Sequence, residues 1–185
     1  YQRRENQKEK FTPQAVTPEK SQEENMTEFV LGSYRLEVDV EATRAWDGRY
    51  GNATGGCGCA YCRNYAAAVG VLPPEAAAFL EPLGLNLRRP GDIGEYGPRQ
   101  GGRWYMPMWH IAGRLLEAGE GELPVAPGVT AGFATDMGPF LRNFPEPCFQ
   151  CWLSMTLPWV LEEPADEAAD DRDDEVKTLD RRTEP

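Results

Sequence analysis

The chain has 185 residues, with 19 basic and 30 acidic side chains, one histidine and a formal net charge of -11 at neutral pH. Hydrophobic residues make up 41% and charged residues 26%, as in a soluble globular protein with an excess of acid. The acidic balance argues against a nucleic-acid-binding protein, which needs a basic surface to neutralise phosphates. No apolar run reaches about 18 residues, which argues against a membrane span.

Charge and hydrophobicity divide the chain into three regions. Residues 1–25 carry five acidic and five basic side chains with few apolar ones, so we expect a disordered segment or an upstream extension before Met26. Residues 162–185 carry eleven acidic and four basic side chains, which predicts a disordered acidic tail. Residues 26–161 hold 17 of the 19 aromatic residues and have the length of a single domain.

The domain begins with a predicted hairpin followed by a short helix. Two apolar runs within 29–40 flank Gly32 and Ser33, which is typical of a tight turn between two strands. Residues 34–41 alternate apolar and charged side chains with period two, which indicates a half-buried strand. Residues 41–47 then have a helical composition.

Two helices are predicted next. Residues 59–72 have a helical composition, and Pro73 and Pro74 end that helix and begin another over 75–83. Gly84 is placed to terminate the second helix.

The remaining pattern predicts strands over 92–96, 103–113, 129–135 and 148–161, separated by turns that contain Gly and Pro. Pro107 predicts that the second of these is an edge strand or a bulged one. Strands at both ends of the domain with helices between them predict an α+β fold, with a mainly antiparallel sheet and the helix pair packed on one face.

Three cysteines within six residues form the clearest candidate site. Cys57, Cys59 and Cys62 follow two glycines that allow the backbone to fold around an ion. Soft thiolates select zinc or an iron–sulfur cluster, and a structural zinc ion needs four ligands. The sequence therefore predicts a zinc site with three of its ligands in this cluster.

Two sets of residues compete to complete such a site. His110 is the preferred fourth ligand, although a single histidine in an aromatic context is also typical of a packed core residue. The alternative joins Cys59 and Cys62 to Cys148 and Cys151. A strand over 148–157 would point the last two to opposite faces, and Cys151 then reads as a small core residue.

Other functions compete with a metal site. Cys59 and Cys62 form a C-x-x-C at a helix start, where the helix dipole would favour a thiolate and redox chemistry, but no strand directly precedes it. A metal-free interaction module with ordinary packing cysteines is the third hypothesis. The aromatic residues Trp104, Tyr105 and Trp109 are more typical of core packing than of a ligand platform.

The core also resembles a family of short proteins from gut-type Firmicutes. The resemblance rests mainly on CGCAYCRNYAAAV at 57–69 and FPEPCFQCWLSMTLPWVLEEP at 144–164, with YRLEVDVEATRA at 34–45, LPPEAAAFLEPLGL at 72–85 and EYGP at 95–98 between them. No activity is established for that family, so the resemblance implies a group and no mechanism. It implies that the Cys57–Cys62 cluster belongs to the family pattern and that Cys148 and Cys151 do not.

Together these observations predict a small cytoplasmic protein, stabilised by zinc, that binds an unknown protein partner and is not an enzyme. With one histidine and no recognisable Ser/His/Asp set, the sequence offers no catalytic residues.

Overall fold

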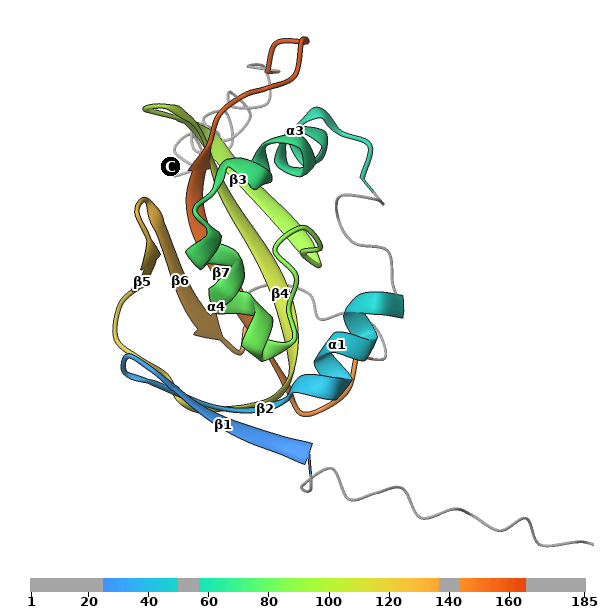
Figure 1. Cartoon of the computed structure of the whole chain (residues 1–185), viewed down its shortest axis with the longest axis vertical. Helices are drawn as coiled ribbons and strands as arrows, with labels where there is room; N and C mark the ends of the chain where they lie inside the picture. Colours follow the sequence, from blue (N-terminus) through green and yellow to red (C-terminus); the bar gives the residue numbers. More distant parts are fainter. Residues whose placement is uncertain (1–24, 50–56, 137–143, 166–185) are drawn as a thin grey trace, which may run out of the picture.

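The computed structural model describes residues 25–49, 57–136 and 144–165 (Figure 1). These residues form seven strands: β1 (Met26–Leu31), β2 (Tyr34–Asp39), β3 (Asp92–Arg99), β4 (Gly102–Glu117), β5 (Leu123–Ala126), β6 (Val129–Ala134) and β7 (Cys148–Leu157). The helices are α1 (Val40–Arg49), α3 (Ala60–Ala68) and α4 (Pro74–Leu80), and the 3-10 turns η2 (Val69–Val71) and η3 (Glu81–Leu83) follow α3 and α4. Most of the two predicted terminal segments, and the glycine loop before Cys57, lie outside the described residues.

All seven strands belong to one antiparallel sheet, which confirms the predicted α+β class. The strand order is β1-β2-β4-β7-β6-β5, and β3 also pairs with β4. The 16-residue β4 is the central strand of the sheet. It pairs with β7 along 103–112, with β3 along its first half and with β2 near its C-terminal end. The sheet is strongly curved, and α4 lies against its inner face (Figure 1).

Pro107 does not mark an edge strand, so that prediction is wrong. Pro107 pairs with Ile93 of β3, and β7 lies on the other side of β4. The pairing of β4 with β7 is interrupted at Met106 and Pro107 and resumes in the same register at Met108. A proline without an N–H group is tolerated here because the ladder is open at this point. The register shift in this region lies in β3, between Glu95 and Pro98.

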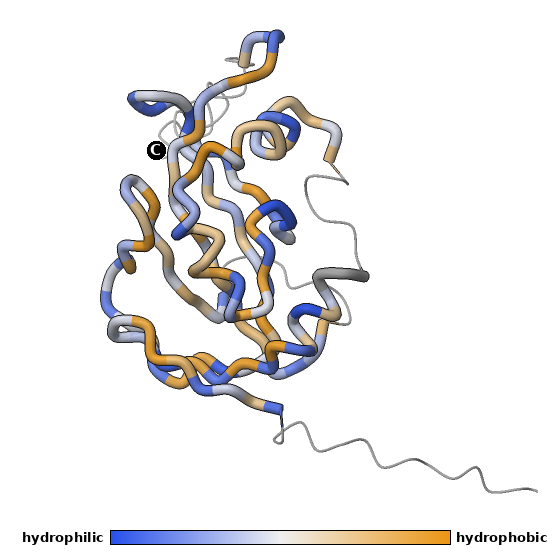
Figure 2. Tube along the Cα trace, in the orientation of Figure 1, coloured by the Kyte–Doolittle hydropathy of each residue, from blue (hydrophilic) through white to orange (hydrophobic). Residues whose placement is uncertain are grey.

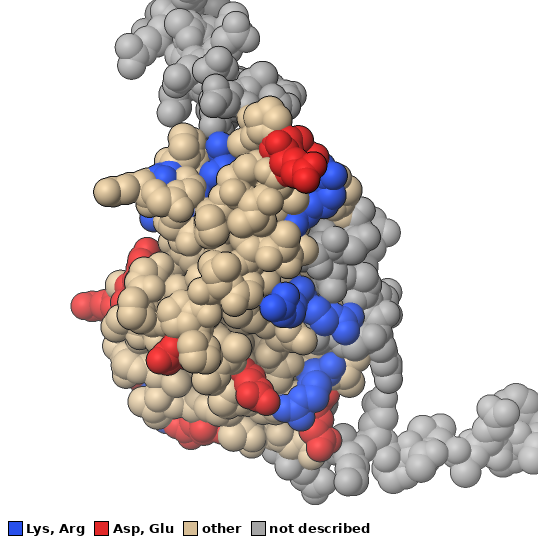
Figure 3. Space-filling view, turned by 45° about the horizontal axis from the view of Figure 1, so that its top comes forward, with Lys and Arg blue, Asp and Glu red and all other residues tan. Residues whose placement is uncertain are grey.

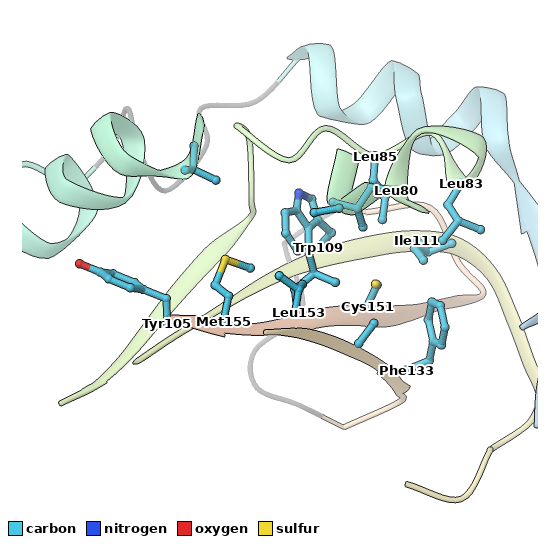
Figure 4. Packing of buried hydrophobic residues seen from close by; sticks show 14 of the residues in the cluster. Leu80, Leu83, Leu85, Tyr105, Trp109, Ile111, Phe133, Cys151, Leu153 and Met155 are labelled. Carbon is cyan, nitrogen blue, oxygen red and sulfur yellow. The ribbon is translucent and has the colours of Figure 1, made fainter. Parts of the chain in front are cut away.

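The predicted period-two patterns are confirmed and define the inner face. In β2 every second side chain is buried, and hydrophobic and hydrophilic residues alternate along this strand (Figure 2). The inward side chains of β7 are at most 1% exposed: Phe149, Cys151, Leu153, Met155 and Leu157. They meet side chains of β4, η3 and the segment after it in one hydrophobic core (Figure 4).

Both predicted helices form and contribute to this core. Tyr65 of α3 and Leu80 of α4 are fully buried. Pro74 occupies the first turn of α4, and Gly84 adopts the left-handed conformation (φ 81°) that ends η3, as expected. The structure does not confirm that the two helices pack on each other as a pair. None of the described helices is long and apolar enough to cross a bilayer.

Candidate metal centre

The start of α3 brings three thiols together. The Sγ atoms of Cys57, Cys59 and Cys62 all lie within 4.8 Å of one another. Sulfur atoms bound to one tetrahedral zinc ion lie about 3.8 Å apart, because the Zn–S bond is about 2.3 Å long. The cluster would therefore need to contract by at most about 1 Å per pair to hold one ion. Two of the thiols, those of Cys57 and Cys59, are exposed to solvent, and that of Cys62 is buried.

The local sequence explains this convergence. Cys59 is the N-cap residue of α3, with an extended backbone (φ -67°, ψ 157°), and its sulfur accepts the N–H of Cys62 at 3.5 Å. The chain turns into the helix at Ala60, so residues 59 and 62 lie on the same side of its first turn. Cys57 precedes the cap by two residues and reaches the same point from the incoming loop.

The electrostatics of the cluster separate the thiols. Burial by itself raises the pKa of Cys59, but hydrogen bonds from the backbone N–H groups of Cys62 and Tyr61 and from the neighbouring thiols outweigh it, so the pKa lies below its ordinary value. Burial, and then the hydrogen bonds and negative charge of the other two sulfurs, raise the pKa of Cys62. A second thiolate beside the first is thus opposed by repulsion. A bound cation would remove that repulsion and replace the protons.

Asn64 ties this helix to the rest of the protein. It is fully buried, and its amide uses both donors and the acceptor. Nδ2 donates to the carbonyl of Pro158 at 3.1 Å and to the hydroxyl of Tyr105 at 3.2 Å, while Oδ1 accepts the N–H of Val160 at 2.8 Å. The hydroxyl of Tyr105 in turn donates to the carbonyl of Tyr61 at 3.2 Å. The first turn of α3 is therefore fixed to β4 and to the segment after β7.

Side-chain contacts reinforce the same junction. The rings of Tyr61 and Trp159 meet edge to face, with centroids 5.8 Å apart. Arg63 forms an ion pair with Glu163, and Trp159 Nε1 donates to the carbonyl of Glu163 at 2.7 Å. These contacts show that the segments CRN (62–64) and LPWVLEEP (157–164) lie against each other. Both belong to the longer segments on which the resemblance rests. No local pattern in the sequence identifies these partners of Arg63 and Asn64, which lie 94 to 100 residues away in the chain.

A buried ion pair lies under the same helix. Nε of Arg103 lies 2.6 Å from Oε1 of Glu95, and the two side chains are only 7% and 9% exposed. The guanidinium of Arg103 also lies 5.2 Å from the ring centre of Tyr61. Glu95 further accepts the N–H of Gly97 at 3.0 Å. A buried ion pair therefore lies beside Tyr61 of α3, and the sequence pattern did not single it out.

His110 does not join the cysteine group in this structure. It lies five residues beyond Tyr105 on β4, so the two side chains leave opposite faces of the sheet at positions about 16 Å apart along the strand. Its imidazole is buried beside Gln150, with Nε2 atoms 3.2 Å apart, and packs against Phe144 at 5.5 Å between ring centres. The expected fourth ligand is a packed residue of the outer face, because strand alternation turns it away from α3.

The alternative four-cysteine site is not formed either. Cys148 is half-buried and Cys151 fully buried on β7, three residues apart and therefore on opposite faces, as the strand pattern predicted. Burial raises the pKa of both thiols. All five cysteines and the histidine of the sequence lie within the described residues. The described part of the chain brings no fourth Cys, His, Asp or Glu to the group of three.

Comparison with protein-family models, curated proteins and solved structures found no match for this chain. The resemblance to the Firmicutes family therefore stays a prediction. The candidate site rests on its own geometry.

Proposed function

We propose that this protein binds a soft metal ion, zinc in the first place, through Cys57, Cys59 and Cys62. The convergence of the three thiols within 4.8 Å carries the proposal. A thiolate donor set favours zinc among the common divalent ions because sulfur is a soft ligand. The three residues supply three of the four ligands of a tetrahedral ion, and solvent or a partner's side chain supplies the fourth at the exposed side of the cluster.

The role that this site supports is structural. A metal ion would join the incoming loop to the first turn of α3, which Asn64 already fixes to the segment after β7. We therefore expect a metal-stabilised binding or adaptor protein, since within the described residues no further Cys, His, Asp or Glu joins the three thiols. Its protein partner and cytoplasmic location remain predictions from the sequence.

Metal content of purified protein tests this proposal. Protein prepared under reducing conditions without chelator should hold close to one equivalent of zinc, measured by elemental analysis. The variants C57S, C59S and C62S should each lose most of it. C148S is the matched control, because Cys148 is a half-buried thiol on β7 outside the group. H110Q should also retain the metal, since the imidazole lies on the other face of β4.

Cobalt substitution gives a second, spectroscopic measurement. Co²⁺ bound by three thiolates should show strong sulfur-to-metal charge-transfer absorbance, which falls with each substituted ligand. Less than about half an equivalent of zinc, together with no such absorbance, would refute the proposal. A wild-type thermal midpoint in the C57S/C59S double variant would also refute it and would favour a metal-free interaction module.

Thiol redox chemistry is the second candidate, supported by two sulfur atoms at Cys59 and Cys62 close enough to approach one another. In that case the two thiols would lose two protons and two electrons to an exogenous disulfide, which would be reduced to two thiols as the Cys59–Cys62 bond forms. Equilibration with glutathione, followed by mass spectrometry, distinguishes the candidates. A redox protein would exchange with glutathione after metal removal and would show metal-independent thermal stability.

A further inference from the structure

A cavity of about 590 Å³ lies at the end of α3 remote from the cysteines. Its walls come from α1, η2, the start of α4, η3 and the segment 84–88. The volume falls within the range of small-molecule sites, which are mostly apolar with a few placed polar groups. About ten helical residues separate it from Cys59, so the cavity is distinct from the candidate metal centre.

Two arginines line this cavity, and no carboxylate of the described residues forms an ion pair with either of them. Ion pairs with glutamates are formed, among others, by Arg35, Arg63, Arg103 and Arg114. Within the described residues, by contrast, Arg44 and Arg88 form no ion pair, although Glu81 lines the same cavity. In a chain with a net charge of -11, two unpaired cations at one cavity favour an anionic occupant.

The segment that carries Arg88 is anchored to the core. Trp109 Nε1 donates to the carbonyl of Asn86 at 2.9 Å, and the hydroxyl of the fully buried Tyr65 donates to the carbonyl of Leu87 at 2.7 Å. Asn86 Oδ1 also accepts the N–H of Arg88 at 2.9 Å. These bonds fix the backbone of the cavity wall before any ligand enters, which reduces the ordering cost of binding.

Two glycines make room for the arginines. A Cβ atom at position 70 would lie 2.7 Å from Nη2 of Arg88, so the guanidinium lies over the bare backbone of Gly70. A Cβ atom at position 84 would lie 2.7 Å from the carbonyl oxygen of Val40 and 3.3 Å from the backbone nitrogen of Arg44. The end of η3 therefore approaches the first turns of α1 closely enough to bring Arg44 to the cavity.

The apolar part of the lining defines the rest of the ligand. Leucines at 72, 85 and 87 and the prolines 73 and 74 offer hydrocarbon surface between the polar groups. Basic side chains also lie along the right of the face in Figure 3, with acidic side chains beside the uppermost and the lowest of them. The combination fits an anion carried on a short hydrocarbon body.

We propose that this cavity binds a small amphipathic anion, a carboxylate or a phosphate ester with an aliphatic chain, with Arg44 and Arg88 holding the anionic head. Guanidinium groups match both head groups through paired N–H donors. The hydrocarbon chain would cover the leucines and prolines of the wall. The site is independent of the metal proposal, because it uses none of the cysteines.

Isothermal titration of the full chain in low-salt buffer tests the proposal with three probes of equal chain length: octanoate, octyl phosphate and octanol. At least one anion should bind no less than tenfold more tightly than octanol, and added salt should weaken it. R44Q and R88Q should each weaken anion binding about tenfold. R114Q is the matched control, because Arg114 is also an exposed arginine and pairs with Glu37 on the sheet.

G70A provides a test that keeps both charges, because the added methyl group displaces the guanidinium of Arg88 from its place; it should also weaken binding several-fold. Amide shifts in NMR spectra should map the bound anion to Gly70 and Asn86. Octanol binding as tightly as both anions, no binding of any probe, or an equal loss in R114Q would overturn the proposal. Far-UV circular dichroism confirms that each variant is folded.

Discussion

Replacement of Asn64 by alanine tests how α3 is held over the sheet. The amide is fully buried and makes three hydrogen bonds, to the carbonyl of Pro158, the hydroxyl of Tyr105 and the N–H of Val160. Alanine removes all three hydrogen bonds at once and leaves the three partner groups without the amide. The bond to Tyr105 is the most costly to lose because both of its ends are buried.

The expected cost follows from these partners. A buried partner left unsatisfied costs about 1–3 kcal/mol, and each of the two half-buried bonds contributes about 0.5–1.5 kcal/mol. N64A should therefore lower the free energy of unfolding by about 3 kcal/mol. Y105F removes only the hydroxyl that links Asn64 to Tyr61 and should cost about 1–2 kcal/mol. Because the two residues contact each other, the double variant should cost less than the two single losses together.

Urea unfolding followed by tryptophan fluorescence measures these losses, and Trp159 reports directly from the junction. The measurement is made with reductant and chelator, so that no metal contributes to stability. N86A is the control, because Asn86 is exposed and its side chain accepts one local N–H. A loss in N64A no greater than in N86A, or strict additivity of N64A and Y105F, would refute the reasoning.

The same variant connects stability to the proposed metal site. Residues outside the ligand shell hold the ligands in place, and their loss typically weakens metal binding 10–100-fold. N64A should therefore weaken zinc binding by at least about tenfold, measured by competition with a chromophoric chelator. Unchanged zinc affinity in a destabilised N64A variant would show that the cysteine loop is independent of the junction.

Further expectations concern buried charge and ionisation. E95Q should lower the free energy of unfolding by about 3 kcal/mol, because the guanidinium of Arg103 stays buried without its carboxylate, whereas E37Q at an exposed pair should cost less than about 1 kcal/mol in the same urea titration. Burial raises the pKa of Cys151, so its thiol stays neutral in the folded protein while the unfolded chain ionises it near pH 8.5. Stability should then fall as the pH rises above about 8.5, and less steeply in C151V, when urea midpoints at pH 7 and pH 10 are compared. Burial, partly offset by a hydrogen bond from Asn64, raises the pKa of Tyr105 to about 12, so an absorbance titration should lose a step near pH 12 in Y105F.

Residues 62–64 and 157–164 form one junction in the fold, although they lie far apart in the sequence. Asn64 and Val160 lie 96 residues apart in the chain and are joined by a 2.8 Å hydrogen bond. A substitution of Asn64 would leave backbone groups of the segment 157–164 without their hydrogen-bond partner. The two segments therefore form one structural unit beside the cysteines.

The sequence alone determined the features that depend on neighbouring residues. Period-two alternation identified β2 and β7, because side chains alternate faces in any strand. Pro74 and Gly84 marked helix boundaries through their backbone preferences. The cysteine group was predictable because three thiols within six residues can meet without help from distant parts of the chain.

The tertiary structure decided the features that depend on the order of the strands and on the sheet face on which each side chain lies. Four-residue β5 was missed because its pairing with β6, rather than its composition, makes it a strand. Pro107 lies inside the sheet and His110 turns away from α3 because β4 takes partners on both sides and alternates its faces. The partners of Asn64 and the cavity at Arg44 come from segments far apart in sequence, and no local pattern encodes which distant surfaces will meet when the core is buried.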